Sequence, residues 1–182
     1  MTWIVLIVVA IFVILLVALY NGLVQLRVRS EGAWSDVDVQ LKRRHDLIPN
    51  LVETVKGYAA HEKDTFENVT KCRSAAVSAT APEARVQAEG QLTGALRQLF
   101  AVAENYPQLR ASEQFLSLQQ GLQQIEDALQ SARRYYNAVV RDYNTRIQTF
   151  PAVLIAGPMG FQAKHFFEVS TPDERESVQV KF

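Results

Sequence analysis

An uninterrupted apolar run near the N-terminus constrains this chain more than any other feature of its sequence. The 18 residues from Trp3 to Tyr20 are isoleucine, valine, leucine, phenylalanine and alanine between an aromatic residue at each end. As an α-helix the run rises about 27 Å, close to the thickness of the hydrocarbon core of a bilayer. Tryptophan and tyrosine prefer the interface between lipid and water. We therefore expect residues 1–26 to form a transmembrane anchor and stem, with Trp3, Phe12 and Tyr20 in contact with the lipid bilayer.

A secretory signal peptide is the alternative explanation of this run. Signal peptides carry a basic residue before the apolar stretch and small residues at a cleavage site after it. Here no lysine or arginine precedes the run, and Leu19, Tyr20 and Asn21 stand where cleavage would occur. We therefore predict an uncleaved, single-pass helix. Because the first basic residues, Arg27 and Arg29, follow the run, we expect the N-terminus outside the cell membrane and the domain in the cytoplasm.

The remaining composition argues against several classes of function. The 19 basic and 19 acidic residues all follow residue 26 and cancel, so the sequence gives no reason to expect a nucleic acid as partner. The single cysteine, Cys72, excludes an intramolecular disulfide, and it falls at a predicted core position.

Beyond the anchor, apolar residues recur at steps of three and four and predict one long helix, continuous with the anchor, with Gly22 as only a weak breaker. This stripe comprises Trp34, Val37, Leu41, Ile48, Leu51, Val55, Tyr58 and Val69. Thr80 is the predicted N-cap of a second helix with Pro82 in its first turn, and Tyr106-Pro107 ends or kinks that helix. A third helix with a regular heptad pattern begins near Ser112 and stops at Phe150-Pro151.

Three helices of this length with short connections predict an all-α fold. Residues 27–150 would form an elongated antiparallel bundle of three to four long helices. Residues 151–182 contain prolines and glycines, and we expect an irregular C-terminal tail packed on the bundle. Near its end Val178, Val180 and Phe182 alternate with polar residues, which suits either a strap on its own domain or a peptide offered to a partner.

Two charged residues, Arg44 and Glu62, fall on the apolar seam of the long helix. Buried charges require partners, and two residues so far apart on one helix cannot reach each other. We predict that Arg44 pairs with Glu126 or Asp127, and that Glu62 pairs with an arginine such as Arg133. Such pairs would fix the register of the helices. The alternative is a polar binding pocket around Arg44 and Glu62.

Pro49 lies inside the predicted long helix. It removes the hydrogen bond that its N–H would donate to the carbonyl of His45, at a cost of about 3 kcal/mol or more. The apolar stripe keeps its phase across this position, so we predict a kinked but continuous helix, with Asp46 as a local cap for the Ile48 N–H. A static kink and a moving hinge both remain open.

The sequence shows none of the common catalytic or metal-binding patterns. The histidines, His45, His61 and His165, form no Glu-x-x-His or His-x-x-x-His pair, and no glycine-rich phosphate loop or nucleophile elbow occurs. We predict that the protein is not an enzyme and takes no cofactor.

The sequence resembles the LemA family of bacterial membrane proteins over nearly its whole length. The matching positions are Tyr20-Asn21, Leu23-Val24, Ala33-Trp34, residues 37–44, 46–52 and 54–58, His61-Glu62, Tyr106-Pro107, Leu109, Ala111-Ser112, Ala132-Arg133, Tyr136-Asn137, Tyr143-Asn144, Phe150-Pro151 and Phe166-Phe167. The resemblance implies one N-terminal anchor and three or four long helices. It also implies a link to membrane organisation or membrane stress, no agreed biochemical activity, and no catalytic residues.

These observations predict a membrane-anchored scaffold or adaptor that binds membrane or membrane-proximal proteins, a second copy of itself included. The predicted interaction surface is the polar segment Lys42, Arg43, Arg44, His45, Asp46 and Asn50 beside the proline kink. A large ring- or cage-forming structural protein is the first alternative. An enzyme or ligand-binding protein is the second.

Overall fold

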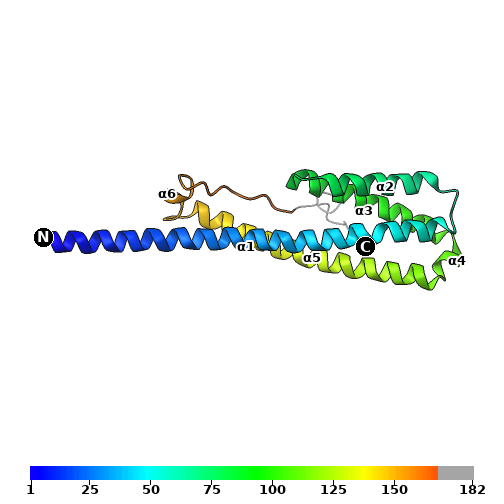
Figure 1. The fold of residues 1–182 in the computed structure, drawn as a ribbon, viewed down its shortest axis with the longest axis horizontal. Helices are drawn as coiled ribbons and strands as arrows, with labels where there is room; N and C mark the ends of the chain where they lie inside the picture. Colours follow the sequence, from blue (N-terminus) through cyan, green and yellow to red (C-terminus); the bar gives the residue numbers. More distant parts are fainter. Residues whose placement is uncertain (168–182) are drawn as a thin grey trace, which may run out of the picture. The chain divides into compact units, whose positions relative to one another are not determined.

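The computed structural model describes residues 1–167, and these residues form helices with no strand among them (Figure 1). The helices are α1 (Thr2–Lys56), α2 (Lys63–Ser78), α3 (Pro82–Glu104), α4 (Pro107–Arg110), α5 (Glu113–Gln148) and α6 (Val153–Ala156). The predicted all-α class is confirmed. The predicted strap at Val178, Val180 and Phe182 lies outside the described residues.

The chain divides into two compact units. Unit 1 consists of Met1–Asp38 and Ser131–Phe166. Unit 2 consists of Val39–Gln130 together with Phe167. Helices α1 and α5 therefore contribute residues to both units.

Helix α1 continues without interruption from Thr2 to Lys56, with Pro49 inside it. Its N-terminal part is the one stretch within residues 1–167 that is both long and apolar enough to cross a membrane. The side chains of Trp3, Phe12 and Tyr20 are exposed, as lipid contact requires. The expectation that the anchor runs directly into the next helix is confirmed.

The prediction that this helix extends to Val69 is wrong. The chain leaves the helix at Gly57, and the N–H groups of Tyr58 and Ala59 both donate to the carbonyl of Val55, at 3.0 and 2.9 Å. Glycine weakens a helix, and here it opens a tight turn before α2. Tyr58, predicted to be buried, is 44% exposed, whereas Val55 and Ala59 are buried.

The start of α3 and both ends of α5 lie near a proline or a serine. Helix α3 begins with Pro82 in its first turn, but its N-cap is Ala81 without a side-chain cap, so the assignment of Thr80 is wrong. Helix α5 begins at Glu113, where the Phe115 N–H lies 3.5 Å from Ser112 Oγ. It ends at Gln148, shortly before Phe150-Pro151.

The apolar core of unit 2 draws side chains from five helices. Its buried members include Ile48, Leu51 and Val55 of α1, Phe66 and Val69 of α2, Leu92, Leu96 and Leu99 of α3, Leu109 of α4, and Phe115 and Leu122 of α5. Cys72 packs at the edge of this core and is half-buried, not central as predicted, and its thiol lies 3.6 Å from Asn68 Oδ1.

Unit 1 has a core of its own. The segment that follows α5 packs back on α1 and α5 through a small set of apolar side chains: Leu23, Tyr143, Ile147, Ala152, Ala156 and Phe161, with Val24, Leu26 and Ile155 half-buried against them.

A buried polar cluster as the candidate functional site

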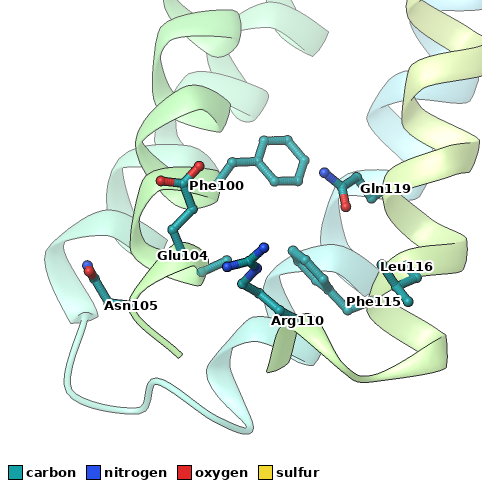
Figure 2. Close-up of a pocket in the computed structure, with 8 residues that line it drawn as sticks. Phe100, Glu104, Asn105, Arg110, Phe115, Leu116 and Gln119 are labelled. Carbon is teal, nitrogen blue, oxygen red and sulfur yellow. The ribbon is translucent and has the colours of Figure 1, made fainter. Parts of the chain in front are cut away.

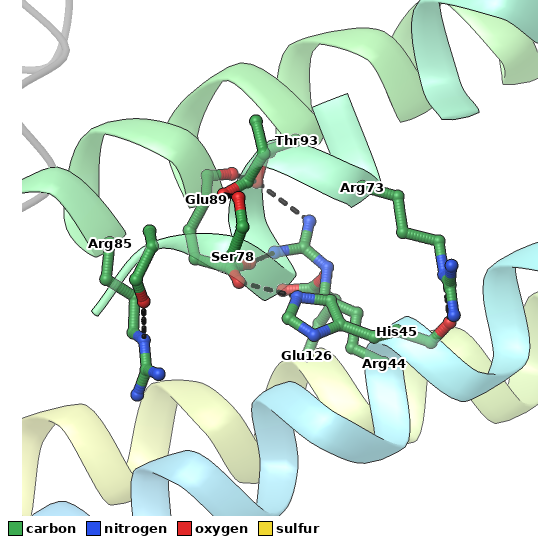
Figure 3. Close-up of polar contacts among 10 residues, drawn as sticks. Arg44, His45, Arg73, Ser78, Arg85, Glu89, Thr93 and Glu126 are labelled. Carbon is green, nitrogen blue, oxygen red and sulfur yellow. Dashed lines mark hydrogen bonds and ion pairs between the residues drawn. The ribbon is translucent and has the colours of Figure 1, made fainter. Parts of the chain in front are cut away.

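Arg44 is the centre of a polar cluster inside unit 2 (Figure 3). Arg44 is only 1% exposed. Its Nη1 donates to Glu89 Oε2 at 3.0 Å and its Nη2 donates to Thr93 Oγ1 at 2.8 Å. Its Nε lies 2.8 Å from Glu126 Oε1 as an ion pair, although the angle is poor for a hydrogen bond. The guanidinium therefore has an oxygen partner at each of its three nitrogens.

Glu89 is fully buried, and both of its carboxylate oxygens have partners. Oε2 accepts from Arg44, and Oε1 lies 2.7 Å from His45 Nε2. A carboxylate oxygen can only accept a hydrogen bond, so His45 donates. Charge-assisted bonds of this kind offset the cost of removing a carboxylate from water.

The cluster ties three helices of unit 2 together. Arg44 and His45 belong to α1, Glu89 and Thr93 to α3, and Glu126 to α5. Because each contact requires one alignment of the helices, the cluster fixes their register as well as their proximity.

A fourth helix joins through Arg73, which resolves the problem raised by Pro49. The His45 carbonyl would normally accept from the N–H of residue 49, but proline has none. Arg73 of α2 donates its Nε–H to this carbonyl at 2.7 Å. Pro49 lies within the continuous helix α1, as predicted, and the bond that it deletes is replaced from another helix.

The pairing of Arg44 with Glu126 agrees with the prediction, but its main partner, Glu89, was missed. Glu89 lies three residues before Leu92 and seven before Leu96, both of which are buried on α3. Extending the apolar stripe of that helix toward its N-terminus would have placed Glu89 on the core face.

The predicted interaction surface must be corrected, because Arg44 and His45 are buried and cannot contact a partner. The other four residues of the segment, Lys42, Arg43, Asp46 and Asn50, are exposed.

Glu62 does not lie on the seam of α1. It precedes α2 after the turn, is half-buried, and lies 3.5 Å from the hydroxyl of Tyr106. Arg133 belongs to unit 1, and its pairing with Glu62 stays a prediction.

We call the cluster of Arg44, His45, Glu89, Thr93 and Glu126 the polar clamp. It is closed in the sense that its polar groups bond to one another. Arg44 is itself the cation that lies between the carboxylates of Glu89 and Glu126. Among residues 1–167 no group of three or more histidine, cysteine, aspartate or glutamate side chains is arranged to hold a metal ion. A cavity of about 560 Å³ in unit 2 has Phe100, Glu104, Arg110 and Phe115 among its lining residues, and none of the cluster residues lines it (Figure 2).

These features define an all-helical protein with one long apolar N-terminal helix and a core whose charges pair with each other. The model of the LemA family matches residues 33–182, and the chain belongs to this family.

Named relatives agree with this assignment. Magnetosome protein MamQ 2 of Paramagnetospirillum magneticum is 27% identical over 183 residues, which cover 86% of this chain and 67% of the relative. MamQ of Magnetospirillum gryphiswaldense is 25% identical with the same coverage. Protein LemA of Metamycoplasma hominis is 27% identical over 176 residues, covering 94% of this chain and 78% of the relative. None of these names states an enzymatic activity.

Proposed function

We propose that this chain is a membrane-anchored helical adaptor that acts by binding proteins at the membrane surface. The observation that carries the proposal is helix α1, which passes from the apolar N-terminal stretch to residues of the unit 2 core without a break. No separate linker segment is needed between anchor and domain. Anchor and core therefore share one element, which suits a protein that presents a domain beside a membrane.

The closed state of the polar clamp supports the same function. An enzyme needs polar groups that face a substrate, and Arg44 and Glu89 face each other instead. The short turns between α1, α2 and α3 further favour an antiparallel arrangement of the four long helices in a bundle. Such a bundle offers its outer helix faces for binding.

The surface that we propose for binding is the exposed part of the segment beside Pro49. Lys42, Asp46 and Asn50 follow one another at four-residue spacing on α1, so they share one face, and Arg43 flanks it. Cations, a carboxylate and an amide within two turns can recognise a polar surface on a membrane or membrane-proximal protein, or on a second copy.

Site-specific photocrosslinking in native membranes tests this surface. A photoreactive residue at Arg43, or one at Asn50, should yield defined adducts. In the chain with the photoreactive residue at Asn50, the double reversal Lys42→Glu with Arg43→Glu should abolish the adducts. The matched control is Lys71→Glu, which reverses an exposed lysine of α2 and should leave the adducts intact. Unchanged adducts and unchanged oligomer size after the double reversal would show that the surface is the wrong one.

The size of the extracted particle separates the adaptor from a ring or cage. After extraction in mild detergent an adaptor should run as a monomer, a dimer or a small complex. A large, homogeneous particle of this chain alone would instead support the structural alternative.

We further propose that the chain sits in the cell membrane with its N-terminus outside and its domain in the cytoplasm. Arg27 and Arg29, just beyond the apolar stretch, support this orientation. In a Cys72→Ala background, a cysteine added after Phe182 should resist a membrane-impermeant maleimide in intact cells. Strong labelling would reverse the orientation.

A further inference from the structure

The segment after α5 exposes large apolar side chains. Phe150 is 79% exposed and Leu154 is 66% exposed, with Val153 and Met159 also open. No charged residue occurs between Arg146 and Lys164. Large apolar side chains gathered on one short segment are unusual on a surface that faces only water.

The opposite side of this segment packs on α1. Ala152, Ala156 and Phe161 are buried in one core with Leu23. The ring of Phe161 meets the ring of Tyr20 edge-on, with centroids 5.9 Å apart. Figure 1 shows α6 beside the N-terminal half of α1, in agreement with these contacts.

These contacts place the segment at the end of the apolar stretch of α1. Tyr20 closes that stretch, and Arg27, the first charged residue, lies 5.8 Å from the centroid of Phe161. Residues 20–27 extend about 10 Å along a helix axis, which is comparable with the headgroup layer on one side of a bilayer. The segment therefore lies at the depth where α1 leaves the lipid.

We propose that residues 150–161 are a second membrane-contacting element, which inserts Phe150, Leu154 and Met159 at the boundary between headgroups and acyl chains. This inference rests on the membrane anchorage in the proposed function. The occupant is the bilayer because the exposed apolar side chains adjoin the anchor through Tyr20 and Phe161.

The basic residues that flank the segment suit lipid phosphates. Arg146 lies in the last turn of α5, and Arg27 is about half exposed in its ion pair with Glu31. Aromatic and apolar side chains with cations beside them are typical of elements that lie in a membrane interface. With two contacts in one leaflet, the rotation of α1 about its axis becomes fixed as well as its depth.

Depth-dependent fluorescence quenching in liposomes tests the proposal with the full chain. Single cysteines carrying an NBD fluorophore are placed in a Cys72→Ala background by Leu154→Cys, Ile11→Cys or Arg134→Cys. Ile11 reports the anchor. Arg134 is an exposed residue of unit 1 about 20 Å before the end of α5 and reports water. The vesicles contain phosphatidylcholine and phosphatidylglycerol, with a nitroxide near the headgroup end of a fraction of the acyl chains.

We expect the shallow nitroxide to quench the Leu154 label several-fold more than the Arg134 label, and aqueous iodide to show the reverse order. Equal iodide quenching at Leu154 and Arg134, with the Ile11 label protected, would overturn this inference alone. Iodide access at Ile11 as well would overturn the membrane anchorage too. The Leu154 label could be shielded from both quenchers at a high ratio of protein to lipid and become accessible when the protein is diluted in lipid. That result would show that a second copy covers this surface, and it would also overturn the inference.

Discussion

The two units of this protein are stabilised by different kinds of polar contact. In unit 2 an arginine, a histidine and a glutamate are buried together, and the glutamate is paired with both of the others. In unit 1 the polar contacts instead attach an extended segment to α5: both amide atoms of Asn144 bond to the backbone of Lys164, at 2.8 and 2.9 Å. The hydroxyl of Tyr136 donates to the carbonyl of His165 at 2.9 Å.

This difference follows from what each unit has to satisfy. Helices satisfy the hydrogen bonds of their own backbone groups. A side-chain cluster between helices is therefore not needed for that purpose and can fix how the helices are aligned. An extended segment has no such internal bonds, and here α5 supplies partners for the backbone of Lys164 and His165. Breaking a contact should therefore have global consequences in unit 2 and local ones in unit 1.

The largest effect is expected from Glu89→Ala. This change leaves Arg44 and His45 in the core without their main acceptor, and we expect a loss of about 3–5 kcal/mol in the free energy of unfolding. The measurement is guanidinium unfolding of the full chain in detergent micelles, followed by circular dichroism. Glu126→Ala, which removes a carboxylate that is 34% exposed, should cost clearly less.

A rescue variant sharpens this test. Replacing the pair together, with Arg44→Met and Glu89→Leu, removes both charges and should recover most of the lost stability. A double variant as unstable as Glu89→Ala would mean that the helix alignment, and not the unpaired charge, was the cause.

The next effect concerns Arg73 and Pro49. Arg73→Leu leaves the His45 carbonyl without a donor, and we expect a cost of about 1–3 kcal/mol. In a Pro49→Ala background the substituted alanine has an N–H that can donate to that carbonyl within α1, so the same replacement should cost at least about 1 kcal/mol less. A double-mutant cycle on unfolding free energies measures the difference. Equal costs in the two backgrounds would contradict the compensation.

In unit 1, Asn144→Ala removes two hydrogen bonds and should cost about 1–2 kcal/mol. The effect should be local, with faster amide hydrogen exchange in peptides covering residues 161–166 and unchanged exchange in α2 and α3. Asn144→Asp keeps the acceptor for the Lys164 N–H but loses the donor, so it should give an intermediate rate. Equal acceleration of exchange in α2 would show that the units are not energetically separate.

The smallest effect is expected from Tyr136→Phe, which keeps the ring contact with Trp34 and loses one hydrogen bond, at about 0.5–1.5 kcal/mol. Burial raises the pKa of Tyr136 above its usual value. A raised folded pKa gives stability that is present below the unfolded pKa of about 10 and is lost as the pH rises through the folded pKa. The stability gap between wild type and Tyr136→Phe should therefore shrink between about pH 9.5 and pH 11. A gap that is independent of pH would show that the hydroxyl is not desolvated.

The site was only partly predictable because its members differ in sequence context. Arg44 stands on a long, regular apolar stripe, so its burial and its need for a carboxylate could be read directly. Glu89 stands near the start of α3, where the stripe is less regular, and His45 stands next to polar residues that suggested a surface. Arg73 could not be predicted, because its acceptor is the backbone carbonyl of His45, which lacks its usual donor owing to Pro49. Which side chain lies close enough to donate to this carbonyl depends on the tertiary structure and is not visible in the sequence pattern.

The sequence by itself determined the long N-terminal helix, α3 and α5, but not the turn that separates α1 from α2. A long apolar run, regular heptads, and prolines at helix starts and ends depend on local propensity and periodicity, which a single chain displays. Only the tertiary structure decided that Glu89 is the main partner of Arg44, and that the segment after α5 lies against the end of the anchor. Each of these depends on contacts between residues far apart in the chain. The energies of such contacts are set by which groups meet and by how little water remains between them.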